Sequence, residues 1–162
     1  MITVFSKKLN KSLQIAIMSE SDAVWYSMKA KEPYSMISIT SKKDGYIAPI
    51  KVNSYLQHFI RFQFNDLDKD VNYLKAPIID DFSGLKSFID NLKSSTLIVH
   101  CGAGMSRSPG LMAAILEYLE VEDYSVFDDK RYKPNMLVYR LASQELGIGK
   151  TQEFYDNLFK EE

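Results

Sequence analysis

One short stretch of the chain, residues 100–108, holds the groups best suited to covalent chemistry. It reads His-Cys-Gly-Ala-Gly-Met-Ser-Arg-Ser and contains the single cysteine of the sequence. Its glycines let the backbone curl so that successive N–H groups point inward, and such a concavity binds anions. Arg107, six positions after Cys101, can complete the ring with a bidentate contact to two oxygens. The stretch therefore predicts a pocket for phosphate or a similar oxyanion above a sulfur nucleophile.

The flanking residues predict the elements that position this pocket. Residues 96–99 are apolar and mostly β-branched, which is typical of a buried parallel strand. Pro109 suits the first turn of a helix, and residues 111–119 are almost continuously apolar. The loop then lies at a helix N-terminus, where inward N–H groups and the guanidinium favour the thiolate of Cys101 over the thiol. A thiolate of this kind is redox-sensitive, so we expect inactivation by peroxide and recovery with a thiol reductant.

The stretch resembles the HC-x5-R-[ST] signature of the protein tyrosine and dual-specificity phosphatases. The resemblance implies that Cys101 attacks phosphorus to form a cysteinyl-phosphate and that Arg107 holds the equatorial oxygens. It also implies that the hydroxyl of Ser108 helps the thiolate leave and that His100 orients the loop. The substrate phosphate would lie against the loop residues, which are Gly102, Ala103, Gly104, Met105, Ser106 and Arg107.

The leaving oxygen also needs a proton, for which a carboxylic acid is the usual donor. In the phosphatases this is an aspartate some thirty-odd residues before the cysteine, just past a core strand. Asp66 fits, because it lies 35 positions before Cys101 (101 − 66 = 35) and directly after an expected strand. Asp68 and Asp70 on the same loop are alternatives, whereas Asp80 and Asp81 suit the first turn of a helix.

A second similarity lies downstream of the expected catalytic helix. Pro134-Asn135 opens a helix after a basic stretch, which is similar to an element of small dual-specificity phosphatases. Asn135 would support the site or serve as a helix N-cap. The basic residues Lys130, Arg131 and Lys133 either bind an acidic substrate flank or form a solvated loop.

The resemblance implies a hydrolase acting on phosphotyrosine, and also on phosphoserine or phosphothreonine, in a protein or peptide. The chain is much shorter than the large tyrosine-specific domains, which favours a shallower cleft. An RNA 5′-triphosphatase, a phosphoinositide phosphatase and a non-catalytic phosphate-binding module remain alternatives. No charged residue occupies positions 102–106, so several phosphates of a lipid headgroup would lack partners.

Composition limits the other possibilities. The 162 residues suit a single catalytic domain over 1–162, with 46% hydrophobic residues to form its core. The net charge of −1 argues against nucleic acid as the main partner. No apolar run approaches the roughly 18 residues of a membrane helix, so no membrane partner is expected. A single cysteine suits the reducing cytoplasm, and the thiolate route needs no metal or cofactor.

The hydrophobic pattern predicts an α/β fold, with a mainly parallel sheet of about four strands flanked by helices. Ser21-Asp22 are expected to cap the helix that starts at Ala23. Strands are expected over 2–5, 34–39, 59–64 and 96–99; helices over 7–18, 23–31, 78–92, 111–119, 134–146 and 151–160; and a turn or short helix over 123–128.

Overall fold

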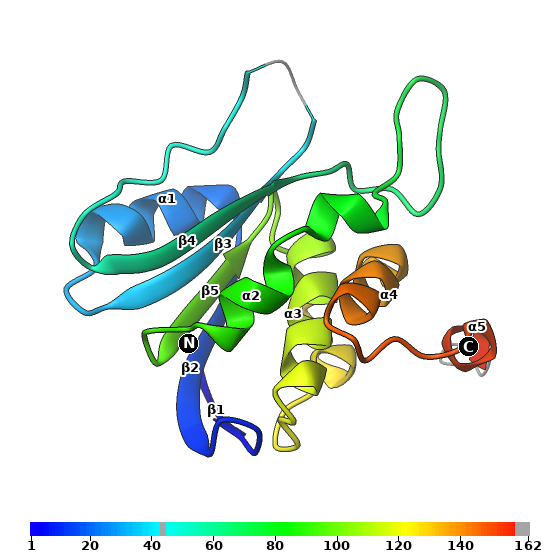
Figure 1. Cartoon of the computed structure of the whole chain (residues 1–162). Coiled ribbons are helices and arrows are strands. Elements are labelled where there is room, and N and C mark those ends of the chain that lie inside the picture. The colour runs from blue at the N-terminus through cyan, green and yellow to red at the C-terminus, as the bar shows by residue number, and fades with distance from the viewer. Residues whose placement is uncertain (43–44, 158–162) are drawn as a thin grey trace.

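The sheet of this computed structural model has five strands, one more than expected; the structure describes residues 1–42 and 45–157. The strands are β1 (Ile2–Ser6), β2 (Lys11–Met18), β3 (Tyr34–Thr40), β4 (Leu56–Gln63) and β5 (Thr96–His100). Their order across the sheet is β1-β2-β5-β3-β4 (Figure 1). Only β1 runs antiparallel to its neighbour, and the other four strands are mutually parallel. The predicted α/β fold with a mainly parallel sheet is confirmed.

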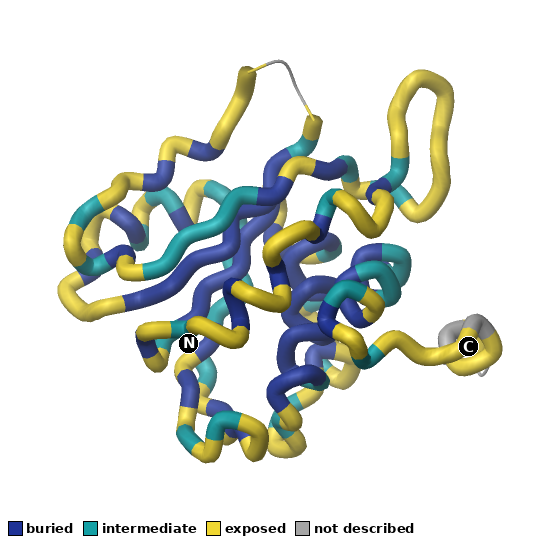
Figure 2. Tube along the Cα trace, viewed as in Figure 1, coloured by how far each residue is buried: buried dark blue, intermediate teal, exposed yellow. Residues whose placement is uncertain are grey.

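Helices cover both faces of the sheet. The helices are α1 (Glu20–Lys29), η1 (Ile79–Phe82), α2 (Leu85–Asp90), α3 (Arg107–Tyr118), η2 (Val126–Asp128), α4 (Met136–Glu145) and α5 (Gln152–Asn157), the last of which lies apart from the sheet (Figure 1). In β5, Ile98 packs with α1, whereas Leu97 and Val99 pack with α2, α3 and α4 on the opposite face. Burial on both faces explains why residues 96–99 are apolar without alternation. The helix α3 is buried along nearly its whole length (Figure 2).

The expected helix over residues 7–18 is wrong, because residues 11–18 form β2. Leu9, Leu13 and Ile17 are four positions apart, and this spacing places side chains on one face of a strand as well as on one face of a helix. A tight turn with Asn10 at φ +52° joins the two strands, and β1 and β2 pair over their lengths. Pairing with β1 and β5 decides the conformation.

Several expected helices have other bounds in the structure, and α3 begins at Arg107 rather than at 111. The expected helix over 78–92 is divided into η1 and α2 by Gly84, whose φ of +90° no continuous helix accommodates. The helix α1 begins earlier than expected, with Ser19 rather than Ser21 or Asp22 as its N-cap. The described part of the last helix is Gln152–Asn157, and positions 158–160 of the expected helix lie outside the described residues.

Parallel strands bring the site residues together, because their carboxyl ends meet at one edge of the sheet. The chain leaves β5 at Cys101, β3 at Ser41 and β4 toward Asp66, and it leaves β2 toward Glu20. These segments surround the start of α3 (Figure 1). No helix within residues 1–42 and 45–157 is long and apolar enough to cross a membrane.

Candidate active site

Cys101 lies at the carboxyl end of the central strand β5, with only 2% of its surface exposed. Its Sγ accepts a hydrogen bond from the backbone N–H of Gly104 at 3.3 Å. The Oγ of Ser108 lies 3.1 Å from the same sulfur. These contacts place a backbone N–H and a hydroxyl against the sulfur.

The loop of residues 101–106 is held in place by backbone contacts with the end of β2 and the segment that follows it. The N–H of Cys101 bonds to the carbonyl of Met18, and the carbonyl of Gly102 accepts from Glu20 at 2.9 Å. Gly104, at φ +73°, lies so close to this segment that a Cβ there would come within 2.7 Å of the Met18 and Ser19 backbone. The curled conformation therefore depends on the end of β2 as well as on the loop itself.

Arg107, at the first turn of α3, is buried to 8% exposure. Its Nη1 donates to the carbonyl of Phe64 and to Oγ of Ser41, both at 3.0 Å. Its Nε is buried and has no hydrogen-bond partner among the described residues. A buried unpaired donor costs about 1–3 kcal/mol, so this nitrogen points to an acceptor that a bound ligand would bring.

His100 supports the loop from below and is fully buried. Its Nδ1 lies 3.2 Å from the carbonyl of Cys101, and its Nε2 lies 2.6 Å from Oγ of Ser38. A carbonyl only accepts, so Nδ1 carries the hydrogen and Nε2 accepts from the serine. Burial lowers the pKa of His100 below its usual value of 6.5, which keeps the ring neutral. The neutral ring can orient the loop, as the resemblance implies.

Asp66 lies beside the loop, on the segment that follows β4. Its Oδ1 accepts from Oγ of Ser106 at 2.8 Å and from the side-chain amide of Asn135 at 2.9 Å. The amide of Asn135 also donates to the carbonyl of Leu67 at 3.2 Å. The structure thus brings Asp66, Ser106 and Asn135 together next to Cys101's loop, and the role of Asp66 as the acid stays a prediction.

The alternative aspartates lie in other environments. Asp70 accepts from the backbone of Ala76 at 2.8 Å, and this bond lowers the pKa of its carboxyl. Asp81 accepts from the backbone N–H at the start of η1 and contacts Lys42. Asp68 and Asp80 are exposed, as Asp66 is, so exposure does not separate them. Among these described carboxyls, only Asp66 accepts a hydrogen bond from the 101–106 loop.

Asn135 forms further hydrogen bonds besides those to Asp66 and Leu67. Its Oδ1 accepts from the N–H of Val138, so it caps α4. Its own N–H donates to the carbonyl of Ser106 at 2.9 Å. The two interpretations of Asn135 in the sequence, helix cap and site residue, therefore both fit the structure.

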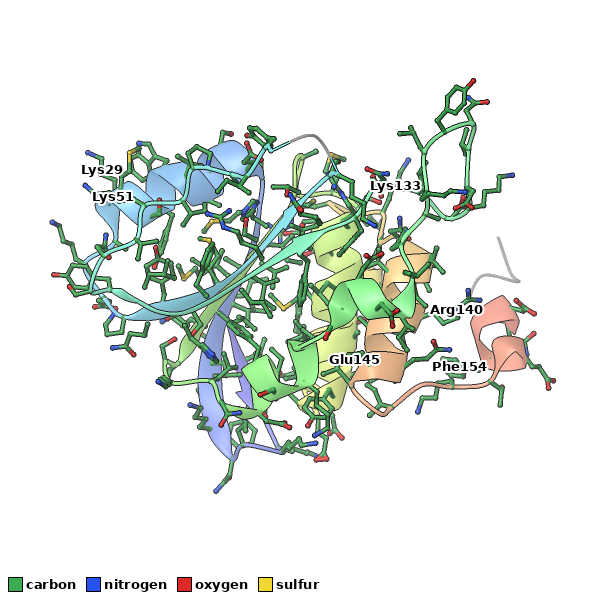
Figure 3. All side chains as sticks on the ribbon, turned by 45° about the horizontal axis from the view of Figure 1, so that its top comes forward. Lys29, Lys51, Lys133, Arg140, Glu145 and Phe154 are labelled. Carbon is green, nitrogen blue, oxygen red and sulfur yellow. The ribbon has the colours of Figure 1, made fainter. Side chains whose placement is uncertain are left out.

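The remaining loop and basic residues are more open to solvent. Gly102, Ala103 and Met105 are exposed. Lys133 lies at the end of the molecule that carries the loop, where its N–H donates to Met105 (Figure 3). Arg131 instead forms an ion pair with Asp129 in the preceding turn.

Sequence reasoning did not identify Ser38, Ser41, Glu20 and Tyr46 as site residues. The first two contact His100 and Arg107 from β3 and its end. Glu20 and Tyr46 line a hollow of about 290 Å³ beside Arg107. A signal was available for Ser41, because it directly follows a strand parallel to β5, and such residues gather at the same edge. No cluster of three metal-ligating side chains occurs in the described part of the chain.

Comparison with known proteins supports the fold. The structure is similar to the crystal structure of the human tyrosine phosphatase-like serine/threonine/tyrosine-interacting protein, with a TM-score of 0.53 and 22% sequence identity. The match covers 83% of this chain and 91% of that one. No family model and no curated protein sequence matches. The chain therefore has a phosphatase-like fold, with Cys101 and Arg107 at the carboxyl edge of its sheet.

Proposed function

We propose that this protein is a cysteine-dependent phosphatase that hydrolyses phosphotyrosine in proteins, with phosphoserine and phosphothreonine as further substrates. One observation supports this most directly. The sulfur of Cys101 lies within contact of the Gly104 N–H and the Ser108 hydroxyl, while the buried Nε of Arg107 has no acceptor among the residues that the structure describes. A phosphoryl group bound in the loop would supply that acceptor and present phosphorus to the sulfur.

In the first step, the thiolate of Cys101 forms a bond to phosphorus as the bond from phosphorus to the ester oxygen breaks. Asp66 gives its proton to the departing oxygen, so the alcohol or phenol leaves neutral. The second step is attack by water on the cysteinyl-phosphate. Asp66, now ionised, takes the water proton, and the Ser108 hydroxyl stabilises the departing sulfur.

The test is hydrolysis of an aryl phosphate and of matched phosphotyrosine, phosphoserine and phosphothreonine peptides, in the presence of a chelator. We expect Cys101→Ser to abolish turnover and to keep phosphate binding, because a serine hydroxyl lacks the charge and nucleophilicity of a thiolate. Arg107→Lys keeps the positive charge but loses the bidentate geometry, so it should lower both turnover and phosphate affinity. Normal turnover by Cys101→Ser would contradict the mechanism.

Acid quenching during turnover provides a second readout. With a substrate whose phosphate is labelled, the quenched wild-type protein should carry the label on Cys101 as trapped cysteinyl-phosphate. The quenched Cys101→Ser variant should carry no label. Tight phosphate binding without turnover in the wild type would instead indicate a non-catalytic phosphate-binding module.

A further inference from the structure

A hollow beside the catalytic loop has side chains of opposite charge on its walls. It measures about 290 Å³, and its lining includes Gly102 and Arg107 of the loop region together with Glu20 and Tyr46. Ile39, Thr40 and Ser41 complete the lining. A substrate whose phosphate contacts Arg107 would therefore place its neighbouring atoms close to the Glu20 carboxylate.

Glu20 is held in this position from two directions. Its backbone N–H donates to the carbonyl of Gly102 at 2.9 Å, which joins the start of α1 to the loop. The hydroxyl of Tyr46 donates to its carboxylate, and this hydrogen bond raises the pKa of Tyr46, so the phenol stays a donor. The carbonyl of Tyr46 in turn accepts from Gln63 at 3.2 Å. The backbone of Glu20 is thus joined to the loop, and its carboxylate is held at the hollow by a hydrogen bond from the half-exposed Tyr46.

The charge of Glu20 has no partner of opposite sign among the described residues, since none of their ion pairs includes it. A fixed carboxylate next to an oxyanion pocket repels the phosphate of any substrate. The repulsion is offset if the substrate itself carries a cation beside its phosphate. A lysine or arginine side chain would form a charge-assisted hydrogen bond with the carboxylate, which is stronger than one from a neutral donor.

We infer that Glu20, held by Tyr46, is a specificity-determining residue that binds a lysine or arginine side chain next to the phosphorylated residue of the substrate. The protein then prefers phosphopeptides with basic flanks over those with acidic flanks. This inference rests on the proposed function and adds a preference for a positive charge beside the phosphorylated residue.

The experiment compares kcat/KM for two phosphopeptides that differ only in arginine or glutamate beside the phosphorylated residue. The wild type should prefer the arginine peptide, and Glu20→Gln should reduce the ratio about two- to fivefold, the range of a partly exposed ion pair. Tyr46→Phe should reduce it less. Glu32→Gln is the matched control, because the same charge is removed at the far end of α1, where Glu32 borders a different cavity. Added salt should shrink the wild-type ratio.

The outcomes separate this inference from the proposed function. If the aryl phosphate is not hydrolysed, the proposed function fails. If it is hydrolysed and the arginine-to-glutamate ratio is the same in wild type and Glu20→Gln, only the role of Glu20 is overturned. A change in thermal stability with an unchanged ratio would show that Glu20 serves only the helix N-terminus. If Glu20→Gln lowered kcat/KM only for phosphate esters rich in hydroxyl groups, the inferred lysine or arginine contact would be wrong. Glu20 would then bind substrate hydroxyl groups.

Discussion

The side-chain amide of Asn135 donates a hydrogen bond of 2.9 Å to Oδ1 of Asp66, from a position 69 residues away in the sequence. Ser106 donates to the same oxygen at 2.8 Å. Because Oδ1 already accepts two hydrogen bonds, the proton of a neutral Asp66 belongs on Oδ2. In the proposed mechanism, Asn135 and Ser106 are therefore positioning residues, which hold one oxygen of Asp66 and leave the other to carry the proton.

Removing the Asp66 carboxyl or the Asn135 amide should affect proton transfer to the leaving group. Asp66→Asn should lower kcat about 100-fold for substrates with poor leaving groups, the lower end of the range for a general acid, and affect a good leaving group much less. Asn135→Ser should have a smaller effect of the same kind, because serine can still cap α4 but lacks the amide donor. Both effects can be measured by comparing kcat of each variant across aryl phosphates with leaving groups of different pKa. If Asp68→Asn had the large effect and Asp66→Asn none, the acid would be Asp68.

The hydroxyl of Ser108, 3.1 Å from the Cys101 sulfur, should act when the sulfur leaves phosphorus. Ser108→Ala should slow hydrolysis of the cysteinyl-phosphate more than its formation, because the departing thiolate loses a donor. Pre-steady-state kinetics should then show a burst of alcohol and a larger trapped phosphoenzyme fraction. An unchanged burst with slower formation would assign the hydroxyl to the first step.

Gly104→Ala should destabilise the protein and remove phosphate binding. The added Cβ would come within 2.7 Å of the Met18 and Ser19 backbone, and the φ of +73° is strained for alanine. We expect the free energy of unfolding to fall by about 1–3 kcal/mol. Gly147→Ala is the control, because Gly147 has a similar φ of +78° and open space around it. Urea unfolding and phosphate titration should show that only Gly104→Ala weakens binding. Equal phosphate affinity in both variants would contradict the close contact between loop and β2.

His100 should make the folded state less stable in mild acid. Burial places its folded-state pKa below the usual 6.5, so the unfolded chain takes up the proton first as the pH falls. Its contribution to stability is complete above pH 6.5 and is lost as the pH falls toward the lowered pKa. Urea unfolding from pH 8 to pH 5 should show this loss in the wild type and a shallower one in His100→Gln. His58 also has a pKa lowered by burial, so the comparison belongs in a His58→Gln background.

Peroxide should inactivate the enzyme, and a thiol reductant should restore activity. The thiolate of Cys101 would be oxidised to sulfenic acid while peroxide is reduced. The single cysteine excludes an internal disulfide, so mass spectrometry should find an added oxygen or a cyclic sulfenamide on Cys101. Inorganic phosphate should slow inactivation, because it covers the sulfur. Activity that resists peroxide would argue against a stabilised thiolate.

The strand-loop-helix arrangement around residues 100–108 could be predicted from the sequence because the relevant information is local. Apolar residues on either side indicated the strand and the helix, and β5 and α3 confirm both. The roles of Cys101, Arg107 and Ser108 in catalysis stay predictions. The choice of Asp66 as the acid came from the resemblance to the phosphatases, which implies an aspartate some thirty-odd residues before the cysteine and just past a core strand. The structure adds what binds it, namely Ser106 and Asn135.

Contacts across the sheet edge were harder to predict because they depend on strand order. Residues 7–18 were expected to be helical, so Glu20 was not placed at the end of a strand next to β5. Ser38 and Ser41 became site residues only because β3 pairs with β5 on its other side. A short polar side chain has no pattern of its own that would reveal such a role.

Backbone contacts of the loop reach residues that are distant in the chain, from Met18 on one side to Asn135 on the other. Loops closed over such distances form late in folding, since their entropy cost precedes their stabilising contacts. During synthesis, a chain released only as far as residue 110 would contain Cys101 and Arg107 but not Lys133 and Asn135, whose N–H groups bond to the carbonyls of Met105 and Ser106. The second half of the loop would then gain its support only after residues up to 135 have been released.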